Sequence, residues 1–112
     1  MGIAKTTLFD AELQTNAELF KALGHPARLA ILKYLASTKT CITGDFADEL
    51  PLSRTTVNQH LNELKDAGLI ICHTEGAKTF YCLNQKKICE LKKAAKSLLD
   101  EISLPEDFIC KP

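Results

Sequence analysis

The sequence has no run of apolar residues close to the roughly 20 that a membrane-spanning helix needs, and its beginning lacks the long apolar segment of a secretory signal. We therefore expect a cytoplasmic protein with no membrane partner. It also has no glycine-rich phosphate loop, no GxSxG sequence and no metal-ligand motif, and the neighbouring Asp48 and Glu49 diverge around a helix. These absences argue against an enzyme, so we predict no catalytic residue and no required cofactor.

Neither charge is in excess, because 14 basic and 14 acidic residues give a formal net charge of zero over 112 residues. Proteins that bind nucleic acids often carry a basic excess. A nucleic-acid interface in this chain must therefore rely on the local placement of basic side chains, and we expect its nonspecific affinity to be weak. The length suits a single domain over residues 1–112.

Apolar side chains recur at three- and four-residue spacing in several segments, which predicts amphipathic helices. Pro26 suits the first position of a helix, Thr43 and Ser53 suit N-caps, and Gly68 suits the residue that follows a helix. The predicted helices are residues 8–23, 26–36, 44–50, 53–67 and 85–103. In the second of them, the side chains predicted to face the core are Leu29, Ile31, Leu32, Leu35 and Ala36.

The pattern changes after Gly68, where two segments rich in β-branched and aromatic residues, 69–73 and 79–83, predict a β-hairpin with Gly76 in its turn. Two short helices followed by a hairpin indicate a winged helix-turn-helix. The predicted fold class is mainly α with a small β-hairpin (α+β), with about five helices and a two-stranded wing. We expect a flexible N-terminal arm at 1–7 and an irregular C-terminal tail at 104–112.

The helix predicted at 53–67 carries polar side chains opposite its apolar stripe, as a recognition helix in the major groove does. Arginine can bind guanine, asparagine and glutamine can bind adenine, and threonine methyl groups can touch thymine. Lys78, at the tip of the wing, can contact phosphate or the minor groove. An ordinary amphipathic surface helix is the alternative, which the ordered series of elements disfavours. The predicted contacts to double-stranded DNA are Arg54, Thr55, Thr56, Asn58, Gln59 and Lys78.

Three stretches, LFKALGHPARLAILKYL, LSRTTVNQHLNELKDAGLI and TEGAKTFYCLN, resemble the ArsR family of metal- and stress-sensing repressors over roughly residues 15–100. The signatures ALGHPARLAIL and TVNQHLNELKDAGLI are specific in combination. The resemblance implies a homodimer built on the first and last helices, which binds its operator without ligand and releases it when ligand binds. It also implies that Ser53 and His60 belong to the recognition helix with the contacts named above.

The last predicted helix has a heptad-like apolar seam, with spacings of three and four residues. Such a seam is too apolar to stay exposed on a small monomer, so we predict that it lies in the dimer interface. Packing against the first helix of the same chain is the alternative, and both can hold. The seam consists of Ile88, Leu91, Ala95, Leu98 and Ile102.

The chain has five cysteines but no CxxC pair, which argues against a zinc ribbon and predicts free thiols in a reducing cytoplasm. The family's thiolate site at the third helix usually holds two or more cysteines, whereas the matching stretch here has Cys41 alone, at a helix N-terminus that favours the thiolate. The family's zinc-type site needs histidine, which residues 85–103 lack, and the three histidines of the chain are scattered. A histidine-based metal site is therefore disfavoured.

Thiols are the remaining candidates for sensing, because soft thiolates bind arsenite or cadmium and react with oxidants. We expect Cys72 and Cys82 to be small apolar strand residues, on opposite faces if the hairpin loop has two or four residues. The candidate sensing residues are Cys41, Cys89 and Cys110.

Together these features predict a DNA-binding transcriptional regulator, a homodimeric repressor released from its operator by a thiol-reactive metal(loid) or an oxidant. Two alternatives stay open. A winged-helix protein-interaction module is favoured somewhat by the zero net charge. A constitutive repressor with no small-molecule effector would leave all five thiols inert.

Overall fold

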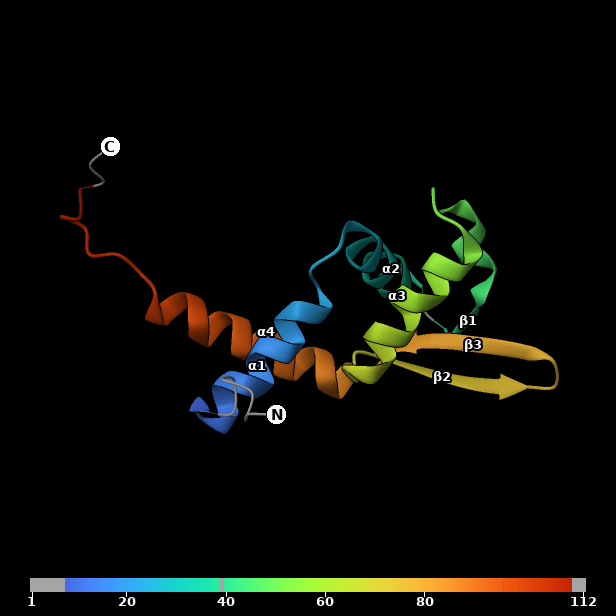
Figure 1. Cartoon of the computed structure of the whole chain (residues 1–112), viewed down its shortest axis with the longest axis horizontal. Helices are drawn as coiled ribbons and strands as arrows, with labels where there is room; N and C mark the ends of the chain where they lie inside the picture. The colour runs from blue at the N-terminus through green and yellow to red at the C-terminus, as the bar shows by residue number, and fades with distance from the viewer. Residues whose placement is uncertain (1–7, 39, 110–112) are drawn as a thin grey trace, which may run out of the picture.

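The computed structural model describes residues 8–38 and 40–109 and confirms the winged helix-turn-helix (Figure 1). The predicted arm at 1–7 and the last residues of the tail, 110–112, lie outside the described residues. From 104 to 109 the chain forms no helix or strand. The elements are α1 (Ala11–Ala22), α2 (Pro26–Ser37), β1 (Ile42–Thr43), the 3-10 helix η2 (Gly44–Glu49), α3 (Arg54–Asp66), β2 (Ile70–Glu75), β3 (Lys78–Leu83) and α4 (Gln85–Glu101).

Side-chain caps place the helix starts close to where the sequence predicts them. The Ser53 hydroxyl accepts a hydrogen bond from the backbone N–H of Thr56 at 3.2 Å, so Ser53 is the N-cap of α3. Pro26 begins α2, as predicted, and the Nδ1 atom of His25 caps it by accepting from the Ala27 N–H at 3.0 Å. Thr43 precedes η2 but makes no side-chain cap bond.

The wing has one strand more than the predicted hairpin. β2 and β3 pair antiparallel through a two-residue turn, in which Gly76 has a φ of 63°. The short strand β1 adds to the other edge of β3 and gives the order β1-β3-β2. β1 thereby ties the segment before η2 to the wing.

The core lies between α1, α2, α3 and the start of β2. On α2 the buried side chains are Ala27, Ile31 and Leu35, which recur every four residues on one helix face. The prediction that Leu29 and Ala36 face inward is wrong, because both lie off that face and are exposed. The largest fully buried side chains are Ile31, Val57, Leu64, Leu69 and Ile70.

Helix α4 extends away from the sheet, with α1 against it (Figure 1). None of its 17 residues is buried, although Ile88 and Leu91 pack against the edge of the core. The radius of gyration is 17.4 Å, against about 13 Å for a compact domain of this length. A single chain therefore leaves much of α4 uncovered. In the described part of the chain, no helix combines the length and apolarity required to cross a bilayer.

Candidate nucleic-acid interface

Helix α3 has one buried face and one polar face. Val57, Leu61 and Leu64 are buried against the core. Beside this stripe lie Arg54, Asn58 and Asn62, four residues apart and all exposed, so that their side chains form one row along the helix. The row begins at the N-terminal end of α3, which is the part of a recognition helix that reaches base edges.

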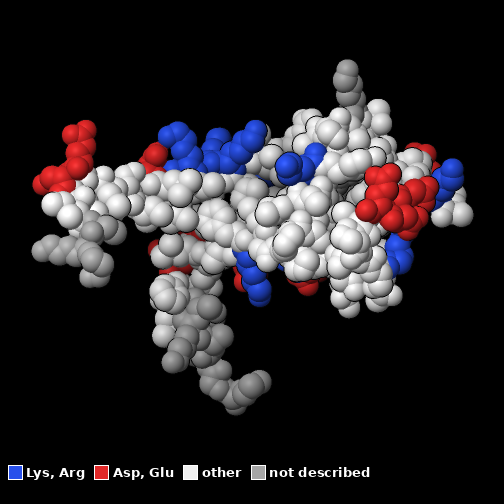
Figure 2. Space-filling view, turned by 90° about the horizontal axis from the view of Figure 1, so that it is seen from above, with Lys and Arg blue, Asp and Glu red and all other residues white. Residues whose placement is uncertain are grey.

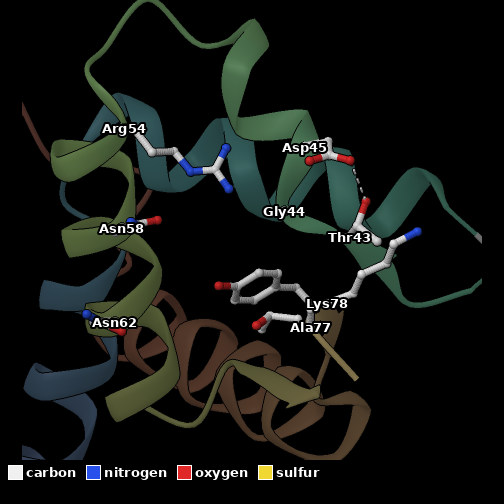
Figure 3. Close-up of a pocket in the computed structure, with 10 residues that line it drawn as sticks. Thr43, Gly44, Asp45, Arg54, Asn58, Asn62, Ala77 and Lys78 are labelled. Carbon is white, nitrogen blue, oxygen red and sulfur yellow. Dashed lines mark hydrogen bonds between the residues drawn. The ribbon is translucent and has the colours of Figure 1, made fainter. Parts of the chain in front are cut away.

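A groove of about 530 Å³ lies between this row and the wing (Figure 3). One wall is α3, a second is the turn and start of β3, and the third is the segment that joins β1 to η2. Figure 3 shows the Arg54 side chain pointing from α3 across the groove toward η2. The lining residues are Thr43, Gly44, Asp45, Arg54, Asn58, Asn62, Ala77, Lys78, Thr79 and Tyr81.

Arg54 is held in place by its surroundings in the free protein. Its Nη1 atom donates to Oδ1 of Asp48 at 3.0 Å. If another residue replaced Gly44, its Cβ atom would lie 3.1 Å from Nη2 of Arg54 and 3.2 Å from the ring of Tyr81. Glycine at position 44 therefore allows the guanidinium and the Tyr81 ring to approach the backbone closely. Both partners of the ion pair are exposed, with side-chain exposures of 48% for Arg54 and 73% for Asp48, so DNA can compete for the guanidinium.

Most of the predicted DNA contacts lie on the outer surface. Arg54, Thr55, Asn58, Gln59 and Lys78 are all exposed. Arg54, Asn58 and Lys78 also line the groove. These residues are available for the predicted contacts with DNA.

Ser53 and Thr56, also predicted to contact DNA, form the N-terminal cap of α3. The Ser53 hydroxyl donates to Oγ1 of Thr56 at 2.9 Å, in addition to accepting the cap hydrogen bond. Their hydroxyl groups are thus engaged with each other, although Ser53 remains exposed. A structural role accounts for both residues in the free protein.

His60 does not lie on the polar face, which corrects the prediction that it contacts DNA. It is 8% exposed and turned toward α2, where its Nδ1 atom accepts from the Nε atom of Arg28 at 3.0 Å. Its ring lies 4.1 Å from that of His25, measured between centroids. Burial, with the charges of His25 and Arg28, lowers the pKa of His60 below 6.5, while Glu63 opposes the shift. A neutral His60 thus fastens α3 to α2.

Sequence reasoning missed the groove wall formed by β1, η2 and β3. Thr43, Gly44, Asp45, Thr79 and Tyr81 come from segments whose approach to α3 has no local sequence signal. Asn62 could have been included, since it continues the four-residue spacing of Arg54 and Asn58. Of the three residues in the row, Asn62 lies farthest from the N-terminal end of α3, which is the end expected to reach base edges.

The zero net charge conceals a separation of charge. Figure 2 shows Lys and Arg side chains gathered over α4. Its exposed lysines are Lys86, Lys92, Lys93 and Lys96. Around the groove, by contrast, Arg54 and Lys78 face Asp45 and Asp48. This balance around the groove favours recognition by directed contacts over a broad electrostatic attraction.

The prediction of free thiols is wrong for two of the cysteines, because Cys41 and Cys82 form a disulfide. Cys41 also precedes β1 and does not start a helix. The predicted opposite orientation of Cys72 and Cys82 is confirmed, since Cys82 faces Ile71 in the register and Cys72 faces Tyr81. Cys72 and Cys89 are free, and Cys110 lies outside the described residues. Within residues 8–38 and 40–109, no three His, Cys, Asp or Glu side chains are grouped to hold a metal ion.

The apolar seam of α4 divides into two parts. Ile88 and Leu91 pack against the core, whereas Leu98 and Ile102 are 37% and 60% exposed. Leu98 lines a groove of about 400 Å³ between α1 and α4, together with Leu13. The alternative of packing on the first helix thus holds for part of the seam, and an uncovered apolar face remains.

The chain is similar to known DNA-binding regulators. A family model described as a helix-turn-helix domain matches residues 23–73. An HTH-type transcriptional regulator of Methanocaldococcus jannaschii is 40% identical over 86 residues, which cover 77% of this chain and 92% of the relative.

Solved structures share the fold. An ArsR-like transcriptional regulator from Rhodococcus has a TM-score of 0.67 at 24% identity and matches 82% of this chain and 86% of its own, a likeness that shows the fold alone. A homodimeric winged helix-turn-helix DNA-binding domain from Mycobacterium bovis, described as a possible ArsR-family regulator, has a TM-score of 0.63 at 27% identity. That match covers 89% of this chain and 90% of the solved one.

Proposed function

Because the chain belongs to the ArsR family of winged helix-turn-helix transcriptional regulators, we propose that it is a homodimeric repressor that reads its operator with α3 and the wing. The observation that carries the proposal is the groove between the polar row of α3 and Lys78 of the wing. The groove is bounded on three sides by side chains able to donate or accept hydrogen bonds. α3 enters the major groove, and Arg54 and Asn58 contact base edges there.

Dimerisation is supported by the exposed apolar face of α1 and α4. Leu13 and Leu99 are 51% and 61% exposed, and Leu98 and Ile102 continue the same face. A second copy of the chain is the occupant we propose, because the similar Mycobacterium bovis domain is homodimeric. A dimer would place two α3 helices in successive major grooves of a near-palindromic operator.

We propose that the protein acts in the cytoplasm, where its DNA target lies. The effector we propose is a thiol-reactive compound. Arsenite, cadmium and oxidants all react with thiolates. The bond between Cys41 and Cys82 supports the oxidant most directly, since it is the product that an oxidant would form. Operator release by arsenite or cadmium would instead favour the metal(loid).

A mobility-shift titration against the DNA upstream of the protein's own coding region tests the proposal. Arg54→Ala should cost roughly 1–3 kcal/mol of binding free energy and relax specificity at one base position. Lys78→Ala should weaken binding to all sequences alike and lower the salt dependence. Normal binding by both variants would show that α3 and the wing are not the interface. Absence of DNA binding by the wild type would favour a protein-interaction module.

A further inference from the structure

Cys41 and Cys82 lie directly opposite each other at the end of the β1–β3 ladder. Ile42 pairs with Tyr81 and Thr43 pairs with Phe80, so the same register places Cys41 against Cys82. Their Cα atoms are 4.5 Å apart, the separation of about 4.5 Å expected for a non-hydrogen-bonded antiparallel pair. The antiparallel register of the folded protein thus brings the two sulfur atoms within bonding reach.

This cysteine pair adjoins the DNA-facing groove. β1 is held to the sheet by only two residue pairs, and it continues into Thr43 and Gly44, which line the groove. On the other strand, Cys82 follows Tyr81, another lining residue. A bond between the sulfur atoms therefore decides how firmly the β1–η2 wall is held against the wing. Through Gly44 and Asp48, that wall also contacts Arg54.

We propose that Cys41 and Cys82 are a reversible dithiol–disulfide pair, oxidised by peroxide, that sets the shape of the DNA-binding groove. The inference rests on the proposed function and names a regulation of that same site. Both cysteines are partly exposed, so small oxidants and reductants reach them. Cys72 and Cys89 do not take part, because Cys72 points to the other face of the hairpin and Cys89 lies on α4.

The reaction balances with a hydroperoxide as the oxidant. One cysteine thiolate attacks the peroxide oxygen, the O–O bond breaks, and the sulfur becomes a sulfenic acid while an alcohol or water leaves. The second thiol attacks that sulfur, forms the S–S bond and expels water. Two electrons pass from the sulfur atoms to the peroxide, and the two thiol protons leave in the products. A dithiol reductant reverses the step by thiol–disulfide exchange.

The oxidised state is the one in which the groove has the form described above. Without the bond, β1 and its two residue pairs can separate from β3, and DNA binding must then order this wall at an entropic cost. We therefore expect the disulfide form to bind operator DNA severalfold more tightly than the dithiol form. Peroxide would strengthen repression, and reductant would relieve it. This direction is the opposite of the release by an oxidant that the sequence predicts.

The test compares the full chain after treatment with dithiothreitol and after treatment with hydrogen peroxide. Alkylation with mass spectrometry reports whether Cys41 and Cys82 are bridged. Hydrogen exchange of the β1 and β3 amides reports whether the wall is fixed, and a titration with the upstream DNA fragment reports affinity. The variants Cys41→Ser and Cys82→Ser remove the pair, and Cys72→Ser, Cys89→Ser and Cys110→Ser are matched controls.

Support requires peroxide to bridge Cys41 with Cys82, to slow exchange in β1 and to raise DNA affinity, with all three effects lost in Cys41→Ser and Cys82→Ser and kept in the controls. Equal exchange and affinity in the two redox states would overturn the proposal. So would a redox effect that survives in Cys41→Ser. If neither state binds DNA, the proposed function fails, and the bridging and exchange data still decide whether the pair fixes the wall.

Discussion

Arg54 is the side chain with the widest range of contacts to offer DNA, and in the free protein Asp48 holds it. The carboxylate of Asp48 would also lie near DNA phosphates and repel them. To contact a base, Arg54 must therefore give up its hydrogen bond to the Asp48 carboxylate and donate to an acceptor on the base instead. We infer that Asp48 lowers affinity for all sequences while it keeps Arg54 extended across the groove.

Asp48→Asn should accordingly raise DNA affinity about 1.4- to fivefold, since exposed ion pairs contribute about 0.2–1 kcal/mol. The measurement is a DNA titration at fixed salt. Glu49→Gln is the matched control, because it removes one exposed negative charge from the same helix without affecting the Arg54 ion pair. An equal gain in both variants would mean that net charge, and not the Asp48–Arg54 contact, sets the affinity.

His60 makes stability depend on pH. Its pKa is lowered in the folded protein by burial and by His25 and Arg28, so below about pH 6.5 the unfolded chain binds a proton at this position more readily than the folded chain does. The free energy of unfolding should therefore fall as pH drops from 7 toward 5. Urea denaturation should show a smaller fall in His60→Gln than in wild type. His73→Gln, on the exposed wing, should retain the wild-type slope, and a wild-type slope in His60→Gln would contradict this assignment.

At the scale of elements, the disulfide closes a long loop. Cys41 and Cys82 are 41 residues apart in sequence, and cross-linking a loop of this length stabilises a protein by up to about 4 kcal/mol through the unfolded chain. Reduction should thus lower the urea midpoint markedly in the wild type. In a Cys41→Ser variant, dithiothreitol should have no effect. A wild-type midpoint that reduction leaves unchanged would show that the loop closure contributes nothing.

Elements with strong local signals were predictable from the sequence. The Ser53 cap, Pro26 and Gly68 with its φ of 80° place the ends of α2 and α3 because each satisfies a local backbone requirement. β1 was missed because two residues carry no periodicity, and its pairing is decided by contact with β3, far along the chain. The Cys41–Cys82 pair escaped prediction for the same reason, since it follows from that register.

The candidate site was predictable only on its helical side. The four-residue spacing from Arg54 to Asn58 follows from helix geometry alone. The placement of His60 failed because the family resemblance was followed over helix spacing: His60 comes three residues after Val57 and four before Leu64, which puts it on the buried face, where it has a partner. That partner, Arg28, lies 32 residues earlier and has no local signal.

At the scale of the whole molecule, α4 is the helix least accounted for by a single chain. Leu98→Asp should dissociate the proposed dimer, because it would place an unpaired charge in the interface that we propose on α1 and α4. Sedimentation should then give the mass of one chain, while circular dichroism should show retained helix content, since Leu98 lies outside the buried core. Leu91 is a poorer choice, because it packs against the core of its own chain.

Leu52→Asp provides the control for Leu98→Asp, with a similar exposure of 38% in the loop before α3. It should remain dimeric at the same concentration. Monomeric wild type at micromolar concentration would contradict the dimer directly. Loss of dimers in both variants would point to general destabilisation.

The most direct test of the proposed function is the composition of the DNA complex. Duplexes selected by the protein from a random pool would be sequenced and then weighed with bound protein by native mass spectrometry. We predict an inverted repeat with half-sites about one helical turn or more apart, occupied by two chains, and, with Arg54→Ala, the same repeat with one base position relaxed in each half-site. One chain per duplex, or a pool without any shared sequence, would contradict a dimer that reads its operator with α3.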